Sequence, residues 1–204
     1  MNRIGIINYG LSNFDSVLRA VEECGGNPML ITDYKELSKV SHIILPGVGS
    51  FQKGMENLRT SGFEDEIKEQ CLNQHIPLLG ICLGMQLLAS YGFEGGQNEG
   101  LGLIEGEVKL FVSTNNERIP HIGWNEIVKK KHNVIVDGIH DSSDFYFVHS
   151  YHFIPKSDEN IIATTPYCGD FMSIVNRENI FGCQFHPEKS SKNGFRILKN
   201  FLNI

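Results

Sequence analysis

The chain has 204 residues, of which 41% are hydrophobic and 21% are charged, and its formal net charge is −6 at pH 7. This composition is typical of a globular protein, and no apolar run reaches the roughly 20 residues needed to cross a bilayer. The acidic balance and the lack of a basic stripe argue against binding to a nucleic-acid backbone. The expected partners therefore include neither nucleic acid nor a membrane.

The length fits one domain, residues 1–204, which is long enough to enclose a well-defined active site. Five cysteines, an odd number, are scattered along the chain without a paired C-x-x-C spacing. We therefore expect reduced thiols and no metal site. The first nine residues hold one short apolar run, which predicts a strand rather than a signal peptide, so the cytoplasm is the expected compartment.

The first half of the chain alternates short apolar runs with segments of helical periodicity. Strands are predicted at Ile4–Asn8, Met29–Ile31, His42–Leu45 and Pro77–Ile81. Helices are predicted after a cap at Ser12, near Tyr34–Leu37, and over Phe51–Leu58, Phe63–Asn73 and Leu83–Ser90. Such alternation is typical of an α/β fold with an open, mostly parallel central sheet flanked by helices.

The second half, after Tyr91, is rich in β-strand signals. A glycine-rich stretch, Glu94–Gly106, comes first. Strands are predicted at Val108–Val112, Trp124–Val128, Phe145–His152, Ile161–Thr165, Met172–Val175 and Phe181–Phe185, followed by a closing helix at Lys192–Leu202. We therefore expect a flavodoxin-like, three-layer fold with additional antiparallel strands in its C-terminal half.

The segment from Gly80 to Gly84 has the form of a nucleophile elbow. An apolar strand runs into G-x-C-x-G, with Cys82 at its centre, and a helix follows. A sharp strand-to-helix turn holds a nucleophile in a strained conformation, and flanking glycines allow close approach of neighbouring backbone. The positive end of the helix dipole also favours a thiolate. Cys82 is thus the candidate nucleophile rather than one more buried thiol.

A general base and acid for this thiol is offered by His186-Pro187-Glu188. Pro187 favours an extended conformation of His186, which would place the side chains of His186 and Glu188 on the same side. The carboxylate would then orient the imidazole and stabilise its charge, as in a catalytic triad. An isolated histidine is more often structural, so this interpretation depends on the pairing with the elbow.

Donors for an oxyanion are expected where a parallel strand ends at Pro46. The backbone amides of Gly47, Val48 and Gly49 lie at the edge where open α/β sheets place their ligand crevice. The amide of Leu83, directly after the nucleophile, is the second expected donor.

Seven segments together resemble the class I (triad) glutamine amidotransferases, and among them the glutaminase subunits of imidazole glycerol phosphate synthases. They are Ile6–Asn13, Pro46–Phe51, Gly80–Leu88, Gly100–Gly106, Pro120–Asn125, Tyr146–Tyr151 and Cys183–Ser190. The elbow and H-P-E mark the wider family, whereas P-H-I-G-W-N and Lys189 resemble the synthase subunits in particular. The resemblance covers nearly the whole chain.

The resemblance implies that Cys82 forms a γ-glutamyl thioester, that His186 shuttles protons and that Glu188 orients His186. It implies that L-glutamine is bound by Gln86, Glu94, Ser150 and Tyr151. No cofactor is implied.

The resemblance also implies a heterodimer with a HisF-type (β/α)₈ cyclase. Ammonia would pass to that partner, which makes imidazole glycerol phosphate and AICAR in histidine biosynthesis. Pro120, Asn125 and Lys189 would lie at the interface. Leu11-Ser12 and His152 depart from the commonest family pattern, so a paralogue that supplies ammonia for amidation of a nucleotide-linked sugar remains an alternative.

Two other classes of protein remain open. A cysteine peptidase or redox-responsive protein can use the same elbow, because fold and nucleophile alone do not define a substrate. A non-enzymatic subunit would be expected to lack part of the triad, and all three residues are present. His149 and His152 do not predict a metal site, since a spacing of three on one strand puts them on opposite faces.

Overall fold

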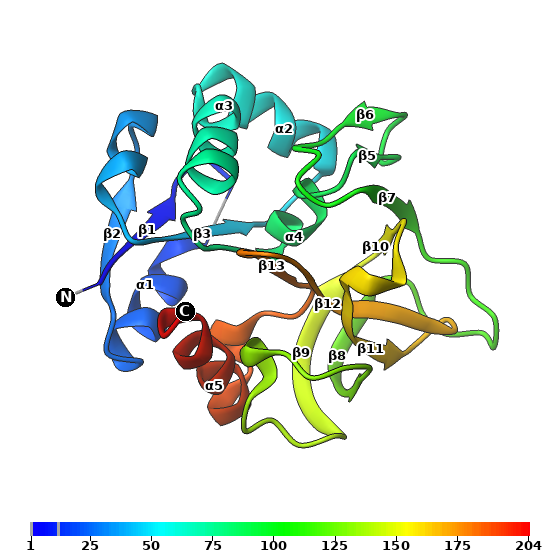
Figure 1. Cartoon of the computed structure of the whole chain (residues 1–204). Coiled ribbons are helices and arrows are strands. Elements are labelled where there is room, and N and C mark those ends of the chain that lie inside the picture. Colours follow the sequence, from blue (N-terminus) through cyan, green and yellow to red (C-terminus); the bar gives the residue numbers. More distant parts are fainter. Residues whose placement is uncertain (1, 12) are drawn as a thin grey trace.

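The computed structural model describes residues 2–11 and 13–204, and the predicted helix cap at Ser12 lies outside this range. A nine-stranded sheet of order β2-β1-β3-β4-β13-β12-β11-β8-β9 separates two groups of helices (Figure 1). A smaller four-stranded sheet, β10-β7-β5-β6, lies beside it. The predicted three-layer α/β architecture is confirmed.

Five neighbouring strands of the large sheet run parallel. They are β2 (Asn27–Ile31), β1 (Arg3–Ile7), β3 (His42–Gly47), β4 (Leu78–Cys82) and β13 (Ile180–Cys183). All residues of β3, β4 and β13 are buried, because helices cover both faces of a parallel sheet. The carboxyl ends of β3 and β4 meet where Gly47 pairs with Cys82.

The remaining strands are mainly antiparallel, as expected for the C-terminal half. The large sheet continues through β12 (Asp170–Arg177), β11 (Ile161–Pro166), β8 (His121–Lys129) and β9 (Ser143–His149). The small sheet contains β10 (Tyr151–Pro155), β7 (Gly106–Leu110), β5 (Tyr91–Gly92) and β6 (Asn98–Glu99). The last two strands were not predicted; β5 lies just before the glycine-rich segment and β6 lies within it.

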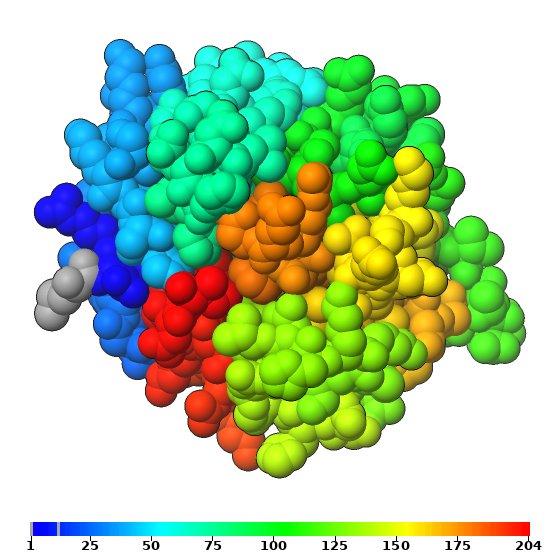
Figure 2. All heavy atoms as spheres, viewed as in Figure 1, coloured from blue at the N-terminus to red at the C-terminus, as the bar shows by residue number. Residues whose placement is uncertain are grey.

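Helices pack on both faces of the large sheet. One face carries α1 (Phe14–Glu23) and α5 (Ser191–Leu202), whereas the other carries α2 (Phe51–Thr60), α3 (Phe63–Lys68) and α4 (Leu83–Leu87). Each group buries its apolar side chains in a separate hydrophobic cluster. The C-terminal helix, red in Figure 2, also packs against β9 of the β-rich half. None of the helices in the described ranges is long and apolar enough to span a membrane.

Two predicted elements at the candidate site were wrong in extent. The predicted strand Phe145–His152 is two strands, β9 and β10, which separate at Ser150 and join different sheets. The predicted helix Leu83–Ser90 ends at Leu87, because the amides of Leu88 and Ala89 bond to carbonyls only three residues earlier and so tighten the last turn. Both differences lie at the candidate site.

Shorter helical segments complete the chain. The segment after α3, Glu69–Asn73, is a π-helix rather than a continuation of the α-helix. Turns of 3₁₀-helix occur at Tyr34–Lys39, Val134–Val136, Asp158–Asn160 and Pro187–Lys189. The last of these directly follows His186 and leads into α5, so it connects the candidate base to the C-terminal helix.

Candidate active site

Cys82 lies at the junction of β4 and α4 in the strained backbone conformation expected of an elbow, with φ 53° and ψ −110°. The two flanking glycines make the turn possible. A Cβ at Gly84 would overlap the Leu45 carbonyl oxygen, and one at Gly80 would lie 2.7 Å from the Gly84 carbonyl oxygen. A side chain at either position would push β3, β4 and α4 apart, so the predicted elbow geometry is confirmed.

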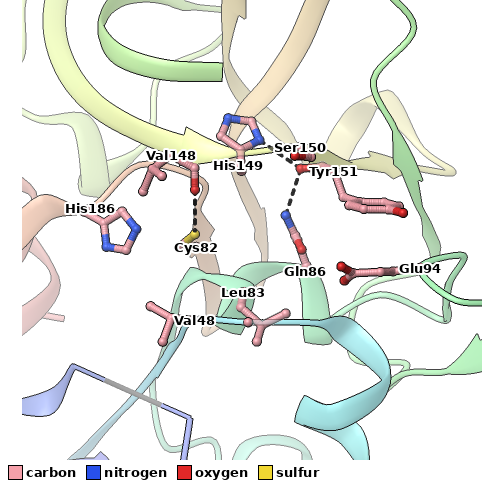
Figure 3. Close-up of a pocket in the computed structure, with 11 residues that line it drawn as sticks. Val48, Cys82, Leu83, Gln86, Glu94, Val148, His149, Ser150, Tyr151 and His186 are labelled. Carbon is pink, nitrogen blue, oxygen red and sulfur yellow. Dashed lines mark hydrogen bonds between the residues drawn. The ribbon is translucent and has the colours of Figure 1, made fainter. Parts of the chain in front are cut away.

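His186 and Glu188 form a buried hydrogen-bonded pair beside the thiol. His186 Nδ1 lies 2.8 Å from Glu188 Oε1, and the two side chains are 5% and 3% exposed. The geometry that joins them differs from the prediction. His186 is extended, but Pro187–Lys189 forms a 3₁₀ turn, which brings the carboxylate back to the ring. His186 and Cys82 line the same cavity (Figure 3).

The electrostatic environment favours a protonated His186. Burial lowers the pKa of His186, but the Cys82 sulfur and the Glu188 carboxylate raise it by more, to about 10. An imidazolium held between a sulfur and a carboxylate is a proton donor at neutral pH. The arrangement is therefore suited to protonating a leaving group after attack by the sulfur.

The cavity above Cys82 has a volume of about 290 Å³. It is lined by Val48, Gly49, Cys82, Leu83, Gln86, Glu94, Val148, His149, Ser150, Tyr151 and His186. This volume is at the lower limit of ligand pockets, roughly 300 Å³, so it fits a small molecule. The cavity brings together the elbow, the base and all four residues predicted to bind substrate.

Gln86 and Glu94 present oxygen atoms at the end of the cavity away from His186 (Figure 3). Gln86 Nε2 donates to the Tyr151 carbonyl at 2.8 Å and to Gln184 Oε1 at 3.0 Å, which leaves Gln86 Oε1 for a ligand. Glu94 Oε2 accepts from the Phe51 amide at the start of α2, at 2.8 Å. Two acceptors at one end of the cavity are suited to a ligand ammonium group.

Ser150 and Tyr151 form the opposite wall, at the point where the chain passes from β9 to β10. The Ser150 carbonyl accepts from the Phe111 amide at 2.9 Å, and the Tyr151 carbonyl accepts from Gln86. These bonds hold the crossing in place. The carbonyl of Val148, two residues before Ser150 on β9, lies 3.9 Å from the Cys82 sulfur.

Of the candidate oxyanion segment Gly47–Gly49, Val48 and Gly49 line the cavity together with Leu83. Leu83 provides the first amide of α4, which has no partner within the helix. The Val48 amide, in contrast, donates to the Leu11 carbonyl at 2.8 Å. In this conformation Val48 is therefore not free to bind an oxyanion.

Three histidines lie close together at this side of the protein, of which His149 lines the cavity, and their arrangement differs from the prediction. His149 and His152 are on different strands, and both rings lie against Phe111, with centroid distances of 5.1 and 4.7 Å. His121 Nδ1 lies 3.3 Å from His149 Nε2. Within the described residues no group of three histidine, cysteine or acidic side chains is arranged to hold a metal ion.

Comparison with known proteins identifies the family of this chain. The family model described as "Glutamine amidotransferase class-I" matches residues 5–204. The chain belongs to this family. Among curated amidotransferases, it is 45% identical over 201 residues to "Imidazole glycerol phosphate synthase subunit HisH 1" of Campylobacter jejuni subsp. jejuni serotype O:23/36 (strain 81-176), covering 98% of this chain and 100% of that protein.

A second HisH, from Geobacillus thermodenitrificans (strain NG80-2), is 42% identical over 208 residues, covering 100% of this chain and 97% of the relative. Within the class-I glutamine amidotransferases the chain is therefore a member of the HisH group. Solved structures agree on the fold. "Structure of PurLQS from Thermotoga maritima" matches with a TM-score of 0.75 and 20% identity, covering 100% of this amidotransferase and 99% of that chain.

The residues predicted to contact a partner lie outside the cavity of this amidotransferase. Pro120 and Lys189 are exposed, and Asn125 is half-buried on β8. Ile122 and Trp124 lie on β8, between Pro120 and Asn125, and they are 60% and 55% exposed. An exposed apolar pair of this kind is compatible with a protein interface.

Three residues at the amidotransferase site were not predicted as site residues, namely the cavity residues Val148 and His149 and, beneath them, Gln184. Gln184 is fully buried, and its side chain contacts both Cys82 and Gln86. The only signal in the sequence was its place two residues before His186, in a segment that already carried the H-P-E motif.

Proposed function

We propose that this chain hydrolyses L-glutamine to glutamate and ammonia through a Cys82 thioester, in the cytoplasm. The observation that carries the proposal is the convergence of Cys82, His186 and Glu188 on one cavity. The five cysteines are free thiols, which is compatible with a reducing compartment.

The cavity supports one orientation of glutamine. The α-ammonium group would be bound by Gln86 Oε1 and Glu94, because both present acceptors, and Ser150 and Tyr151 would enclose the amino-acid end. The side-chain carboxamide would then extend toward Cys82. The ion pair between Glu94 and the α-ammonium group would hold the reacting carbonyl carbon near the sulfur. Such positioning is the main contribution of binding groups to this kind of reaction.

The chemistry follows from the three side chains. The Cys82 sulfur attacks the carboxamide carbon, and the carbonyl oxygen takes the negative charge. Burial disfavours the protonated form of His186, but Cys82 and Glu188 stabilise it. His186 therefore donates its proton to the departing nitrogen, so ammonia leaves and a thioester remains. Water then attacks the thioester, His186 accepts the water proton, and glutamate is released while the Cys82 sulfur leaves as the thiolate.

The oxyanion would be stabilised by the Leu83 amide and by an amide of Gly47–Gly49. The Val48 amide could bind the oxyanion only after its hydrogen bond to the Leu11 carbonyl breaks. Removing one oxyanion donor lowers rates by about 10²–10³-fold, so the isolated chain is expected to be a slow enzyme.

The partner we propose is a HisF-type cyclase, which would use the ammonia to make imidazole glycerol phosphate and AICAR. The names of the relatives support this, since each is called a subunit of imidazole glycerol phosphate synthase. The interface would include Pro120, Asn125 and Lys189. No observation favours the sugar-amidating paralogue, the peptidase or the redox protein.

The test is glutamate release from glutamine by the purified chain, alone and with a HisF-type cyclase and its nucleotide ligand. We expect release to rise strongly with the partner and to fall by about a thousandfold or more in Cys82→Ala. Cys71→Ala, a buried cysteine on the π-helix, is the matched control and should retain activity. Glutamine left intact with the partner bound would refute the proposal.

A further inference from the structure

Gln184 occupies a position that the proposed chemistry does not yet use. It follows β13 directly, its side chain is fully buried, and its backbone amide donates to the Ser173 carbonyl at 2.9 Å. The side chain therefore has no freedom to turn toward solvent. A buried amide needs hydrogen-bond partners, so its contacts indicate what it does.

The direction of the hydrogen bonds around Gln184 follows from one backbone group. The Tyr151 carbonyl can only accept, so the group of Gln86 that faces it at 2.8 Å must be the NH₂. The same NH₂ lies 3.0 Å from Gln184, which must therefore present its oxygen. The remaining end of the Gln184 amide, its NH₂, then lies 3.7 Å from the Cys82 sulfur.

Two groups with opposite preferences thus contact the Cys82 sulfur. The Val148 carbonyl, 3.9 Å away, accepts from a thiol and repels a thiolate. The Gln184 NH₂ is a donor, so it stabilises the thiolate and cannot accept from the thiol. Because hydrogen bonds to charged groups are stronger than neutral ones, the Gln184 contact favours the reactive form.

We propose that Gln184 is a positioning residue, which holds the Cys82 thiolate with its NH₂ and the substrate-binding amide of Gln86 with its oxygen. One side chain thereby sets the distance between the nucleophile and the group that receives the far end of the substrate. The part that concerns substrate rests on the proposed glutaminase function. The part that concerns the thiolate does not.

The test is the rate at which iodoacetamide alkylates Cys82, followed by peptide mass spectrometry from about pH 5 to about pH 10. Gln184→Met keeps the length of the side chain but removes the donor. We expect alkylation near neutral pH to slow about tenfold and the profile to move to higher pH. Gln184→Glu keeps the shape and places a carboxylate against the sulfur, so its profile should move further.

Gln70→Met is the matched control. Gln70 is also a buried glutamine, but its amide donates to Glu66 on α3 and does not line the cavity. Its alkylation profile should overlay that of the wild type. Labelling of buried Cys71 in the same spectra reports unfolding, so a loss of fold is measured separately from a change at Cys82.

Glutamine kinetics with the partner give an independent readout. Gln184→Met should raise the KM for glutamine as well as lower kcat, because Gln86 loses the acceptor that fixes its orientation. Gln184→Glu keeps an acceptor for Gln86, so it should lower kcat with a smaller change in KM. A purely structural role would leave the Cys82 alkylation profile unchanged in folded protein. Overlaid profiles for wild type, Gln184→Met and Gln184→Glu would refute the proposal.

Gln86→Met decides the question if the Gln184 variants unfold. It removes the other end of the contact and leaves Gln184 unanchored, so the Cys82 profile should shift in the same direction. No shift in this variant would count against the proposal. Alkylation requires neither glutamine nor the partner, so a failure of the glutaminase assignment would be seen separately, as intact glutamine with a shifted profile.

Discussion

At the scale of single residues, the site combines a strained backbone with a buried charge pair. Cys82 has a positive φ, which costs of order 1–3 kcal/mol for a residue with a side chain. His186 and Glu188 are almost completely removed from solvent. The packing around the elbow holds Cys82 in its strained conformation. The charges of His186 and Glu188 compensate each other, so removing one of them would leave the other buried and unpaired.

Glu188→Gln tests the electrostatic role of the carboxylate while keeping its shape. The pKa of His186 is lowered by burial and raised by Cys82 and Glu188, so without the charge the pKa should fall. The imidazolium, which wild type keeps up to about pH 10, would then be lost at lower pH. We expect glutamate release with the partner to fall about 100-fold and its high-pH limb to move to lower pH.

Glu178→Gln, at an exposed glutamate on the turn between β12 and β13, is the control for this experiment and should change neither quantity. A rate and a pH profile equal to those of wild type in Glu188→Gln would show that the carboxylate does not act through His186.

The triad could be predicted because its members have local signatures. Cys82 is surrounded by the glycines that its own turn requires, and Glu188 is two residues from His186. Gln184 has no such signature. Its contacts with Cys82 and Gln86 join residues 102 and 98 positions apart, and a buried glutamine is not distinguished in a sequence from an exposed one. Long-range polar contacts of this kind were therefore missed.

At the scale of elements, the parallel strands were predictable and the break at Ser150 was not. Buried parallel strands are continuous apolar runs, so β3 and β4 stand out in the sequence. The run Phe145–His152 contains no glycine or proline to mark the break, which arises from outside it. The Phe111 amide binds the Ser150 carbonyl, and Gln86 binds the Tyr151 carbonyl. These distant partners turn the chain and form the cavity wall.

The three histidines of β8, β9 and β10 predict acid sensitivity. Burial lowers the pKa of His121 to about 4, of His149 to about 3 and of His152 to about 4. In the unfolded chain each would bind a proton near its ordinary pKa of about 6.5. Between these values the unfolded state holds more protons, so the free energy of unfolding should decrease as pH falls from about 6.5 to about 4.

His121→Phe isolates one of these contributions, since His121 already stacks on Phe147 and Tyr167. We expect the variant to lose less stability than wild type between about pH 7 and about pH 5, with a difference of about 1–2 kcal/mol. Urea unfolding at both pH values measures it. Equal losses in the two proteins would show that His121 does not contribute to the acid limb.

At the scale of the whole molecule, the two halves supply different parts of the site. The parallel half provides Cys82 and the segment Gly47–Gly49, and the antiparallel half provides the wall from Val148 to Tyr151. His186 follows β13, the strand where the parallel and antiparallel parts meet. The turn Pro187–Lys189 then leads into α5, which packs against both α1 and β9.

Phe201→Ala therefore tests whether loosening α5 from the parallel strands also affects the antiparallel half, as expected if α5 joins the two into one cooperative unit. Phe201 is fully buried, and its ring packs against His42 on β3 and Phe181 on β13, at centroid distances of 5.4 and 6.2 Å. Truncation leaves a cavity, so we expect the free energy of unfolding to fall by about 3–5 kcal/mol. Phe93→Ala, at a ring that is 36% exposed, should cost clearly less.

The shape of the unfolding curve of Phe201→Ala shows whether the two halves unfold together or separately. If α5 couples the halves, fluorescence of Trp124 on β8 and far-ultraviolet circular dichroism should lose signal together at a lower urea concentration, with an unchanged slope. Separate transitions would show that the halves unfold independently. Since His186 lies between the halves, a joint transition also means that the charge pair and the elbow are lost in the same step, so activity and fold should disappear at the same urea concentration.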